Sequence, residues 1–242
     1  MRAVILAAGV GRRLAIEEPK VLLRFGGRTL LERHLCILAA LGVRDVVIGI
    51  GYEALAIERA LATLGQAEVS TVYNPDYEQG SILTLWRVRD ALTAGGPVLL
   101  MDGDVLYDRR VLEPLVETRH ADCLLVDRAY EPGDEPVKVG VTGGVPTDFG
   151  KTIDPAVEPH GESVGFFRLS EGTANVLAET ARRMIDDGGN ERPMEDAVAA
   201  VLRAASPPFG VEDVTGLPWI EIDFPEDVER AESAVLPKLV DG

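Results

Sequence analysis

A set of charged residues follows short apolar segments of this chain, in spacings that suit the binding of phosphate and of a divalent cation. They are Arg12, Arg13, Lys20, Asp102, Asp104, Glu221 and Asp223. Cations behind a glycine-rich turn can neutralise a phosphate chain, and paired carboxylates supply the hard oxygen ligands that Mg²⁺ prefers. The sequence therefore predicts a triphosphate site with a metal ion beside it.

The glycine-rich turn comes first in the chain, after an apolar run that begins at Ala3. The residues expected to surround the nucleotide here are Leu6, Ala7, Ala8, Gly9, Gly11 and Arg12. Both glycines can adopt positive φ and turn main-chain N–H groups toward one surface, while the alanines let a base or ribose approach. Arg13 and Lys20 add positive charge, and Pro19 stiffens the chain before the lysine. An ordinary strand-to-helix turn with solvated arginines is the alternative.

The acidic pair Asp102 and Asp104 stands at the end of the apolar run 97–101. A buried strand gains no stability from charge at its end, so folding alone explains this pair poorly. The alternative is a turn in which the aspartates bind their own backbone. Because Mg²⁺ takes one or two protein carboxylates together with phosphate oxygens, we expect Asp104 to be a metal ligand.

A second acidic pair lies near the carboxyl end of the chain. Glu221 and Asp223 alternate with Ile220 and Ile222, so in a strand both carboxylates share one face while the isoleucines enter the core. We expect both acidic side chains to point at the same metal ion as Asp104.

Strand and helix patterns alternate along most of the chain, which predicts an α/β fold: a three-layer, Rossmann-like arrangement with a mostly parallel central sheet. Expected helices are 29–41, 53–64, 81–92, 172–187, 194–205 and one from Pro225; expected strands are one from Ala3, 45–50, 67–73, 97–101, 123–126, 137–141, 163–169 and 218–222. The glycine-punctuated stretch from 121 to about 167 is expected to form a small antiparallel excursion over the active site. We expect residues 1–242 to form one domain.

Composition limits the class of protein. With 24 basic and 40 acidic residues, the net charge of −16 argues against nucleic-acid binding, and no stretch is apolar enough for membrane insertion. Cys36 and Cys123 are far apart and suit reduced thiols in a cytoplasmic protein. Neither these cysteines nor His34, His120 and His160 need a catalytic role, and each histidine is expected at the surface or in a helix. The oligomeric state stays open, a homodimer included.

The run Leu6–Leu14 followed by Pro19-Lys20 resembles the opening signature of the MobA-like and sugar-phosphate nucleotidyltransferases. This resemblance implies the nucleotide-diphospho-sugar transferase fold, with catalytic Mg²⁺ on Asp104 and Asp223. It also implies Glu221 as a further ligand, and Asp102 beside the metal or the nucleotide. Glu221 two residues before Asp223 looks most like the cytidylyltransferases of phosphocholine and related phospho-alcohols or phosphonates.

Further likenesses to this family concern the base and the acceptor. The segment 74–85 resembles the lining of a pyrimidine pocket, and the lysine after Gly150 resembles one that contacts the acceptor phosphate. An acidic pair at 195–196 resembles carboxylates that hold a cationic head group, although Pro193 and Met194 stand where choline-specific members have aromatics. The residues implied are Gln79, Ser81, Thr84, Lys151, Glu195 and Asp196. Helix capping is the alternative for Ser81, and simple helix-start charge for the acidic pair.

The favoured function is therefore a Mg²⁺-dependent transfer of CMP from CTP to a small phosphorylated alcohol or phosphonate, with release of pyrophosphate. Arg13, Lys20 and Lys151 are expected to assist by neutralising charge. A sugar-1-phosphate or inositol-1-phosphate nucleotidyltransferase is the neighbouring alternative. A nucleotide-binding regulatory module without turnover is the alternative from another class, and it would be expected to lack the loop lysine or a metal carboxylate, all of which are present.

Overall fold

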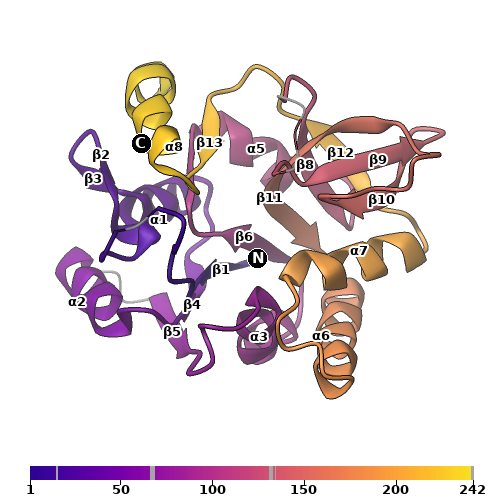
Figure 1. Ribbon diagram of the computed structural model, residues 1–242, viewed down its shortest axis with the longest axis horizontal. Coiled ribbons are helices and arrows are strands. Elements are labelled where there is room, and N and C mark those ends of the chain that lie inside the picture. The colour runs from indigo at the N-terminus through magenta and orange to yellow at the C-terminus, as the bar shows by residue number, and fades with distance from the viewer. Residues whose placement is uncertain (15, 66–68, 131–132, 134, 241–242) are drawn as a thin grey trace.

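The computed structural model describes residues 1–14, 16–65, 69–130, 133 and 135–240. Four parallel strands form its centre, in the order β6-β1-β4-β5 (Figure 1). Their bounds are β1 (Arg2–Ala7), β4 (Asp45–Ile50), β5 (Val69–Tyr73) and β6 (Val98–Asp102). The carboxyl ends of β1 and β6 lie side by side, because Leu6 pairs with Asp102. The predicted phosphate turn and the first acidic pair thus meet at one edge of the sheet.

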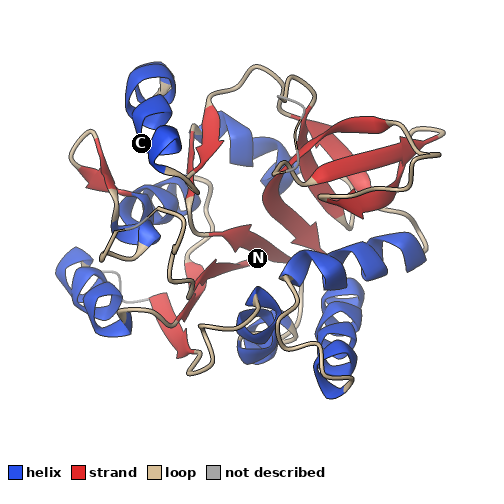
Figure 2. Ribbon diagram, in the orientation of Figure 1, coloured by secondary structure: helices blue, strands red, loops and turns tan. Residues whose placement is uncertain are grey.

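Helices cover both faces of this sheet (Figure 2), as the alternation of side chains along β1 requires. Ala3 and Ile5 pack on one side with α1 (Leu30–Ala40), α2 (Ala54–Leu64) and α5 (Arg109–Glu117). Val4 packs on the other side with α3 (Ser81–Arg87), α4 (Arg89–Leu92), α6 (Glu171–Asp186) and α7 (Met194–Ala204). The three-layer α/β architecture is confirmed.

The antiparallel part extends the sheet beyond β6 and is also confirmed. The strand β11 (Pro159–Leu169) pairs antiparallel with β6, with β8 (Cys123–Asp127) and with β9 (Lys138–Thr142). Two further strands, β10 (Val145–Gly150) and β12 (Gly210–Asp213), complete this region. Their short polar sequences carry little strand signal, and neither was expected from the sequence.

A separate two-stranded ribbon joins the middle of the chain to its carboxyl end. It pairs β7 (Val105–Tyr107) antiparallel with β13 (Trp219–Glu221), and α8 (Pro225–Arg230) follows. A hairpin of β2 (Arg24–Phe25) and β3 (Arg28–Thr29) lies before α1. Leu14, Phe25, Leu106 and Ile220 belong to one apolar cluster beneath α8, so this ribbon has a core of its own.

Most expected elements agree with the structure to within a residue or two. The predicted strand 67–73 is described only from Val69, since 67 and 68 lie outside the described residues. The predicted helix 81–92 is interrupted at Val88, although Leu92 N still donates to Val88 O. Within the described part of the chain, no helix combines the length and apolar character needed to cross a membrane.

Asp148 in β10 anchors α7 to the antiparallel strands. Its buried carboxylate accepts from Phe149 N (2.9 Å), Asp154 N (2.6 Å) and Arg203 Nε (3.0 Å). Burial alone would raise the pKa of Asp148, but these donors and the charge of Arg203 outweigh it and hold the pKa below its usual value. The ionised form therefore stabilises the fold.

We expect Asp148→Asn to lower the free energy of unfolding at pH 7 by about 2 kcal/mol, because charged acceptors are lost to buried donors. Since the folded pKa is depressed, this stabilisation is complete above the usual Asp pKa of about 4 and is lost as the pH falls through the folded value. Denaturant titrations of both proteins at pH 7 and pH 3.5 should show the difference shrinking. Asp186→Asn, at an exposed ion pair, is the control; equal losses in the two variants would contradict the anchoring role.

Candidate active site

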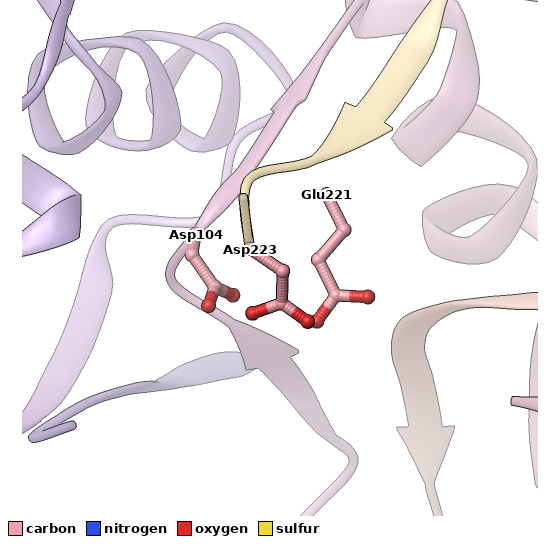
Figure 3. Close-up of side chains that lie close together, drawn as sticks. All are labelled: Asp104, Glu221 and Asp223. Carbon is pink, nitrogen blue, oxygen red and sulfur yellow. The ribbon is translucent and has the colours of Figure 1, made fainter. Parts of the chain in front are cut away.

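Three carboxylates from two distant parts of the chain converge beside the sheet edge. Asp104 lies in the turn between β6 and β7, and Glu221 and Asp223 come from the end of β13. The register of the ribbon brings them together, because Glu221 pairs with Val105 and Ile222 N donates to Asp104 O (2.9 Å). Each offers one oxygen atom within 4.8 Å of the others (Figure 3). The expected alternation is present, with Ile220 and Ile222 buried.

The ammonium group of Lys20 bridges two of these carboxylates. Its Nζ lies 2.9 Å from Asp104 Oδ2 and 2.6 Å from Asp223 Oδ1, and its side chain is 14% exposed. Burial alone would lower the pKa of Lys20, but the two carboxylates outweigh that effect and raise it. Lys20 begins a short 3₁₀ turn directly after Pro19, which sets its approach to the acidic residues.

Other carboxylates crowd the same space. Desolvation raises the pKa of Asp102 well above its usual value, and the charges of Glu195, Asp104 and Glu221 add to the effect. Glu221 reaches solvent within the cleft, yet surrounding protein and the charges of Asp104 and Asp223 also raise its pKa well above its usual value. Gly165 in β11, at φ +78°, leaves the space that Asp102 Oδ2 occupies. Carboxylates this close together can be ionised together only when a cation offsets their repulsion.

The donor set of this cluster fits Mg²⁺. All three converging groups are hard carboxylate oxygens, one from the β6–β7 turn and two from the end of β13, and phosphate oxygens and water would supply the remaining ligands of a bound ion. The ammonium of Lys20 already holds positive charge against two of the three carboxylates. Asp104, Glu221 and Asp223 are therefore the residues that could hold the metal ion.

The glycine-rich turn lies against this acidic cluster. A cavity of about 80 Å³ is lined by Leu6, Ala7, Gly9, Gly11, Lys20, Val21, Gly103 and Asp104. Only Gly11 of the two loop glycines adopts positive φ (+66°), so the expectation of two such glycines is wrong for Gly9. Ala8 is buried and accepts from Tyr52 N, so it supports the loop from beneath instead of lining the cavity.

A glutamate that the sequence analysis missed connects two of the expected cations. Glu135 Oε2 accepts from Arg13 Nη1 (2.9 Å) and from Lys151 Nζ (2.6 Å). These bonds lower the pKa of Glu135, with the hydrogen bond from Lys151 the largest cause. Arg13 also approaches Asp223 Oδ2 at 3.7 Å and lies over the ring of Phe224. Glu135 thus brings together Arg13 and Lys151, two of the cations expected to neutralise phosphate, and no local pattern around Glu135 indicates this contact.

The residues that were expected to contact the base differ in their exposure and hydrogen bonds. Gln79 is exposed, whereas Thr84 is buried with its Oγ1 accepting from Asn74 Nδ2 (3.0 Å). Ser81 Oγ accepts from Met194 N (2.7 Å), so it holds the start of α7 and does not cap its own helix. Arg12 points outward toward Glu78. Of the Gln79, Ser81 and Thr84 side chains, that of Gln79 is the one without a hydrogen bond to the described part of the chain.

A second cavity, of about 470 Å³, brings together the expected acceptor residues. Lys151, Glu195 and Asp196 all line it, with Phe149 and Met184 among the apolar walls. Asp196 is paired with Arg192 (3.3 Å), but Glu195 Oε2 is shielded from solvent and has no hydrogen-bond partner among the described residues. Desolvation raises the pKa of Glu195. Glu195 therefore keeps one oxygen atom beside this cavity that could accept a hydrogen bond.

A third cavity, of about 460 Å³, lies on the other side of Glu221 and Asp223. Its walls include Tyr130, Glu162, Trp219, Phe224 and Arg230. Burial raises the pKa of Glu162 to about 7, with Asp127 adding to the effect. No local sequence pattern indicates this cavity, because its walls come from β8 and the loop after it, β11, β13 and α8, which meet only in the folded chain.

Comparison with known proteins identifies the family. The model of the MobA-like NTP transferase domain matches residues 3–159, which is more than half of the chain. The chain belongs to this family. The family resemblance seen in the sequence is therefore confirmed.

Two curated relatives match nearly all of this chain. It is 30% identical over 251 residues to the CMP-5′-(3-aminopropyl)phosphonate synthase of Streptomyces rubellomurinus, covering 98% of this chain and 39% of that protein. It is also 30% identical over 247 residues to the bifunctional IPC transferase and DIPP synthase of Aquifex aeolicus, covering 99% of this chain and 53% of that protein. The chain thus spans about half, or less, of the length of these relatives.

Solved structures with the same fold include two transferases. The inositol-1-phosphate CTP transferase from T. maritima superposes with a TM-score of 0.75 at 23% identity, covering 99% of this chain and 98% of that one. The CTP:phosphocholine cytidylyltransferase from Streptococcus pneumoniae superposes with a TM-score of 0.78 at 20% identity, covering 96% and 97%. At these identities the likeness establishes the fold, which is the one expected.

We expect Lys20→Met to destabilise the MobA-like fold by about 3 kcal/mol at pH 8, because it leaves clustered carboxylates without their cation. Raised carboxyl pKa values mean that the folded state binds more protons than the unfolded state, so the variant should regain stability as the pH falls from 8 to 6. Addition of 10 mM MgCl₂ should raise its melting temperature more than that of the wild type. Exposed Lys238→Met is the control, and the same pH profile in both variants would contradict the role of Lys20.

Proposed function

We propose that this chain transfers CMP from CTP to a small phosphonate or phosphorylated alcohol, with Mg²⁺ and release of pyrophosphate. The observation that carries the proposal is the triad Asp104, Glu221 and Asp223 beside the glycine-rich turn, with Lys20 between them. Family membership supports it, and so do the two curated relatives that match nearly all of this chain, one of which is named a CMP-5′-(3-aminopropyl)phosphonate synthase.

The nucleotide is proposed to lie over the carboxyl ends of β1 and β6. Backbone groups of the glycine-rich turn and Arg13 would bind its phosphates, and Gln79 would reach the base edge. Mg²⁺, held by Asp104, Asp223 and Glu221, would supply charge neutralisation at the α-phosphate and at the leaving pyrophosphate. Lys20, already at two of these carboxylates, is placed to add its charge where the leaving group develops negative charge.

The acceptor is proposed to occupy the cavity of Lys151 and Glu195. Its phosphate or phosphonate oxygen attacks the α-phosphorus in line, the bond to the pyrophosphate oxygen breaks, and no covalent enzyme intermediate forms. A phosphonate or phosphate dianion is already nucleophilic, so no general base is needed. Lys151 would hold this anion, and Glu195 would receive an ammonium group at the other end of the acceptor.

An amine-bearing acceptor is favoured over a quaternary ammonium. Glu195 offers a buried oxygen that can accept a hydrogen bond, which a primary ammonium provides and a trimethylammonium does not. The aromatic lining of this cavity is Phe149, whereas recognition of quaternary ammonium commonly uses a cage of several aromatic rings. An aminoalkylphosphonate fits these groups, in keeping with the phosphonate named in one relative.

A second candidate is transfer to inositol 1-phosphate or a sugar 1-phosphate. It is favoured by the other curated relative and by the fold likeness to the T. maritima protein. Pyrophosphate release with CTP, UTP, GTP and ATP against aminoalkylphosphonates, phosphocholine, inositol 1-phosphate and glucose 1-phosphate separates the two. Signal with CTP and an aminoalkylphosphonate alone would support the first proposal, and signal only with UTP or GTP and a hexose phosphate would rule it out.

We expect Asp104→Asn to lower kcat by at least about a thousandfold without unfolding the protein, because it removes a metal carboxylate at the reaction centre. Pyrophosphate release and a thermal unfolding curve measure the two effects. Glu226→Gln, an acidic residue that only opens α8, is the control. Retained turnover in Asp104→Asn would remove the metal site from the proposal.

We expect Glu195→Gln to raise KM for an aminoalkylphosphonate by about 10- to 100-fold, since a charge-assisted hydrogen bond is lost. KM for an alkylphosphonate without the amine should change less than threefold. Asp196→Asn is the matched control, because Asp196 is already paired with Arg192. An equal change for both acceptors would show that Glu195 does not read the amine.

A further inference from the structure

His34 is buried in α1 and uses both of its ring nitrogens. Nε2 lies 3.1 Å from the carbonyl oxygen of Gly103, and Nδ1 lies 3.2 Å from the hydroxyl of Tyr107. The ring also packs against Tyr107, with centroids 5.2 Å apart. A histidine that the sequence suggested needs no role is therefore in contact with the turn that carries Asp104.

The two contacts determine which nitrogen bears the proton. A carbonyl oxygen can only accept, so Nε2 must donate to Gly103 O, and in the neutral ring Nδ1 must then accept from the Tyr107 hydroxyl. Burial lowers the pKa of His34 to about 4, which agrees with a neutral ring at pH 7. The Gly103 carbonyl thus fixes the tautomer, and the Tyr107 hydroxyl, which donates to Nδ1, holds the ring in the orientation that lets Nε2 reach Gly103.

Gly103 is held from both sides. Its N–H donates to Leu6 O (3.0 Å) in β1, while its carbonyl accepts from His34. A Cβ at this position would lie 2.9 Å from Leu6 O and 3.0 Å from Ala7 Cβ, so only glycine lets the turn rest this closely on the phosphate strand. Because Asp104 follows directly, the direction of its carboxylate depends on how this peptide is held.

The same contacts reach the second strand of the site. Tyr107 pairs with Trp219 of β13, two residues before Glu221, and packs edge-on against Phe166 of β11. Ile222 N donates to Asp104 O on the far side of the turn. Helix α1, the β6–β7 turn and β13 are therefore joined through one neutral imidazole and one phenol.

We infer that His34 is a positioning residue: with Tyr107, it sets the geometry of the Asp104, Glu221 and Asp223 cluster through the Gly103 peptide. The inference rests on the proposed metal-dependent function of that cluster. A merely structural histidine would stabilise α1 without affecting how the cluster binds a cation, and this difference can be measured without turnover.

The test compares His34→Leu, His34→Gln and Tyr107→Phe with Leu38→Ala, a buried apolar change one turn further along the same helix. Mn²⁺ alone is titrated into each protein, and free Mn²⁺ is followed by electron paramagnetic resonance; melting temperatures, kcat and KM for CTP are measured in parallel. We expect His34→Leu to weaken Mn²⁺ binding about tenfold and to lower kcat more than it raises KM. Leu38→Ala should lose as much thermal stability, yet keep its Mn²⁺ affinity within twofold.

The other variants keep the inference testable if His34→Leu does not fold. A glutamine amide can donate to Gly103 O and accept from Tyr107, so His34→Gln should retain Mn²⁺ affinity within threefold. Tyr107→Phe removes the hydroxyl that donates to Nδ1 and orients the ring, and it should weaken Mn²⁺ binding about threefold. Unchanged Mn²⁺ affinity in His34→Leu or Tyr107→Phe, or losses that follow melting temperature as in Leu38→Ala, would overturn the inference. A wild-type protein that binds no Mn²⁺ and releases no pyrophosphate would instead overturn the proposed function.

Discussion

The arrangement of the site depends on one electrostatic constraint: several carboxylates share a small, partly desolvated space and need positive charge beside them. One carboxylate oxygen from each of Asp104, Glu221 and Asp223 lies within 4.8 Å of the other two. Desolvation raises the pKa of Asp102 beside them, and the charges of Asp104 and Glu221 add to the effect. Like charges at such distances repel strongly unless a cation intervenes. Lys20 meets part of this need within the chain itself. The glycine-rich turn, the β7–β13 ribbon and α8 hold these groups together.

Local sequence patterns predict a site residue where its type and its neighbours in the chain already specify its surroundings. The alternation at Glu221 and Asp223, the glycine-rich turn and Asp104 at a strand end are of this kind, and the fold places them together. Glu135, by contrast, acts through partners more than a hundred residues away or across a hairpin, and nothing beside it in the sequence indicates those contacts. Ser81 likewise holds Met194, 113 positions further along the chain, which neither of its expected roles anticipated.

The fold was predictable for a related reason. Buried parallel strands are continuously apolar and helices have a 3.6-residue period, so the sequence indicates most elements of the central layers. Helix α5 is an exception, because no helix was expected over its residues. The strands β10 and β12 are not indicated either, because they are short and partly polar and are stabilised by pairing with β9 and β8. The start of α3 is also bonded to the segment before α7, through Gly80 N to Asn190 O and Ile82 N to Arg192 O. The proposed base-reading and acceptor segments are therefore one connected unit.

The contact of Glu135 with both Arg13 and Lys151 gives the protein an internal counter-ion. In the proposed reaction these two cations serve different substrates, and between turnovers they would otherwise face each other with no anion between them. When a phosphate or phosphonate binds, a cation exchanges the carboxylate of Glu135 for the anionic group of the substrate, so the local charge balance changes little. Such an exchange lowers the cost of keeping two cations close together in a chain whose overall charge is strongly negative.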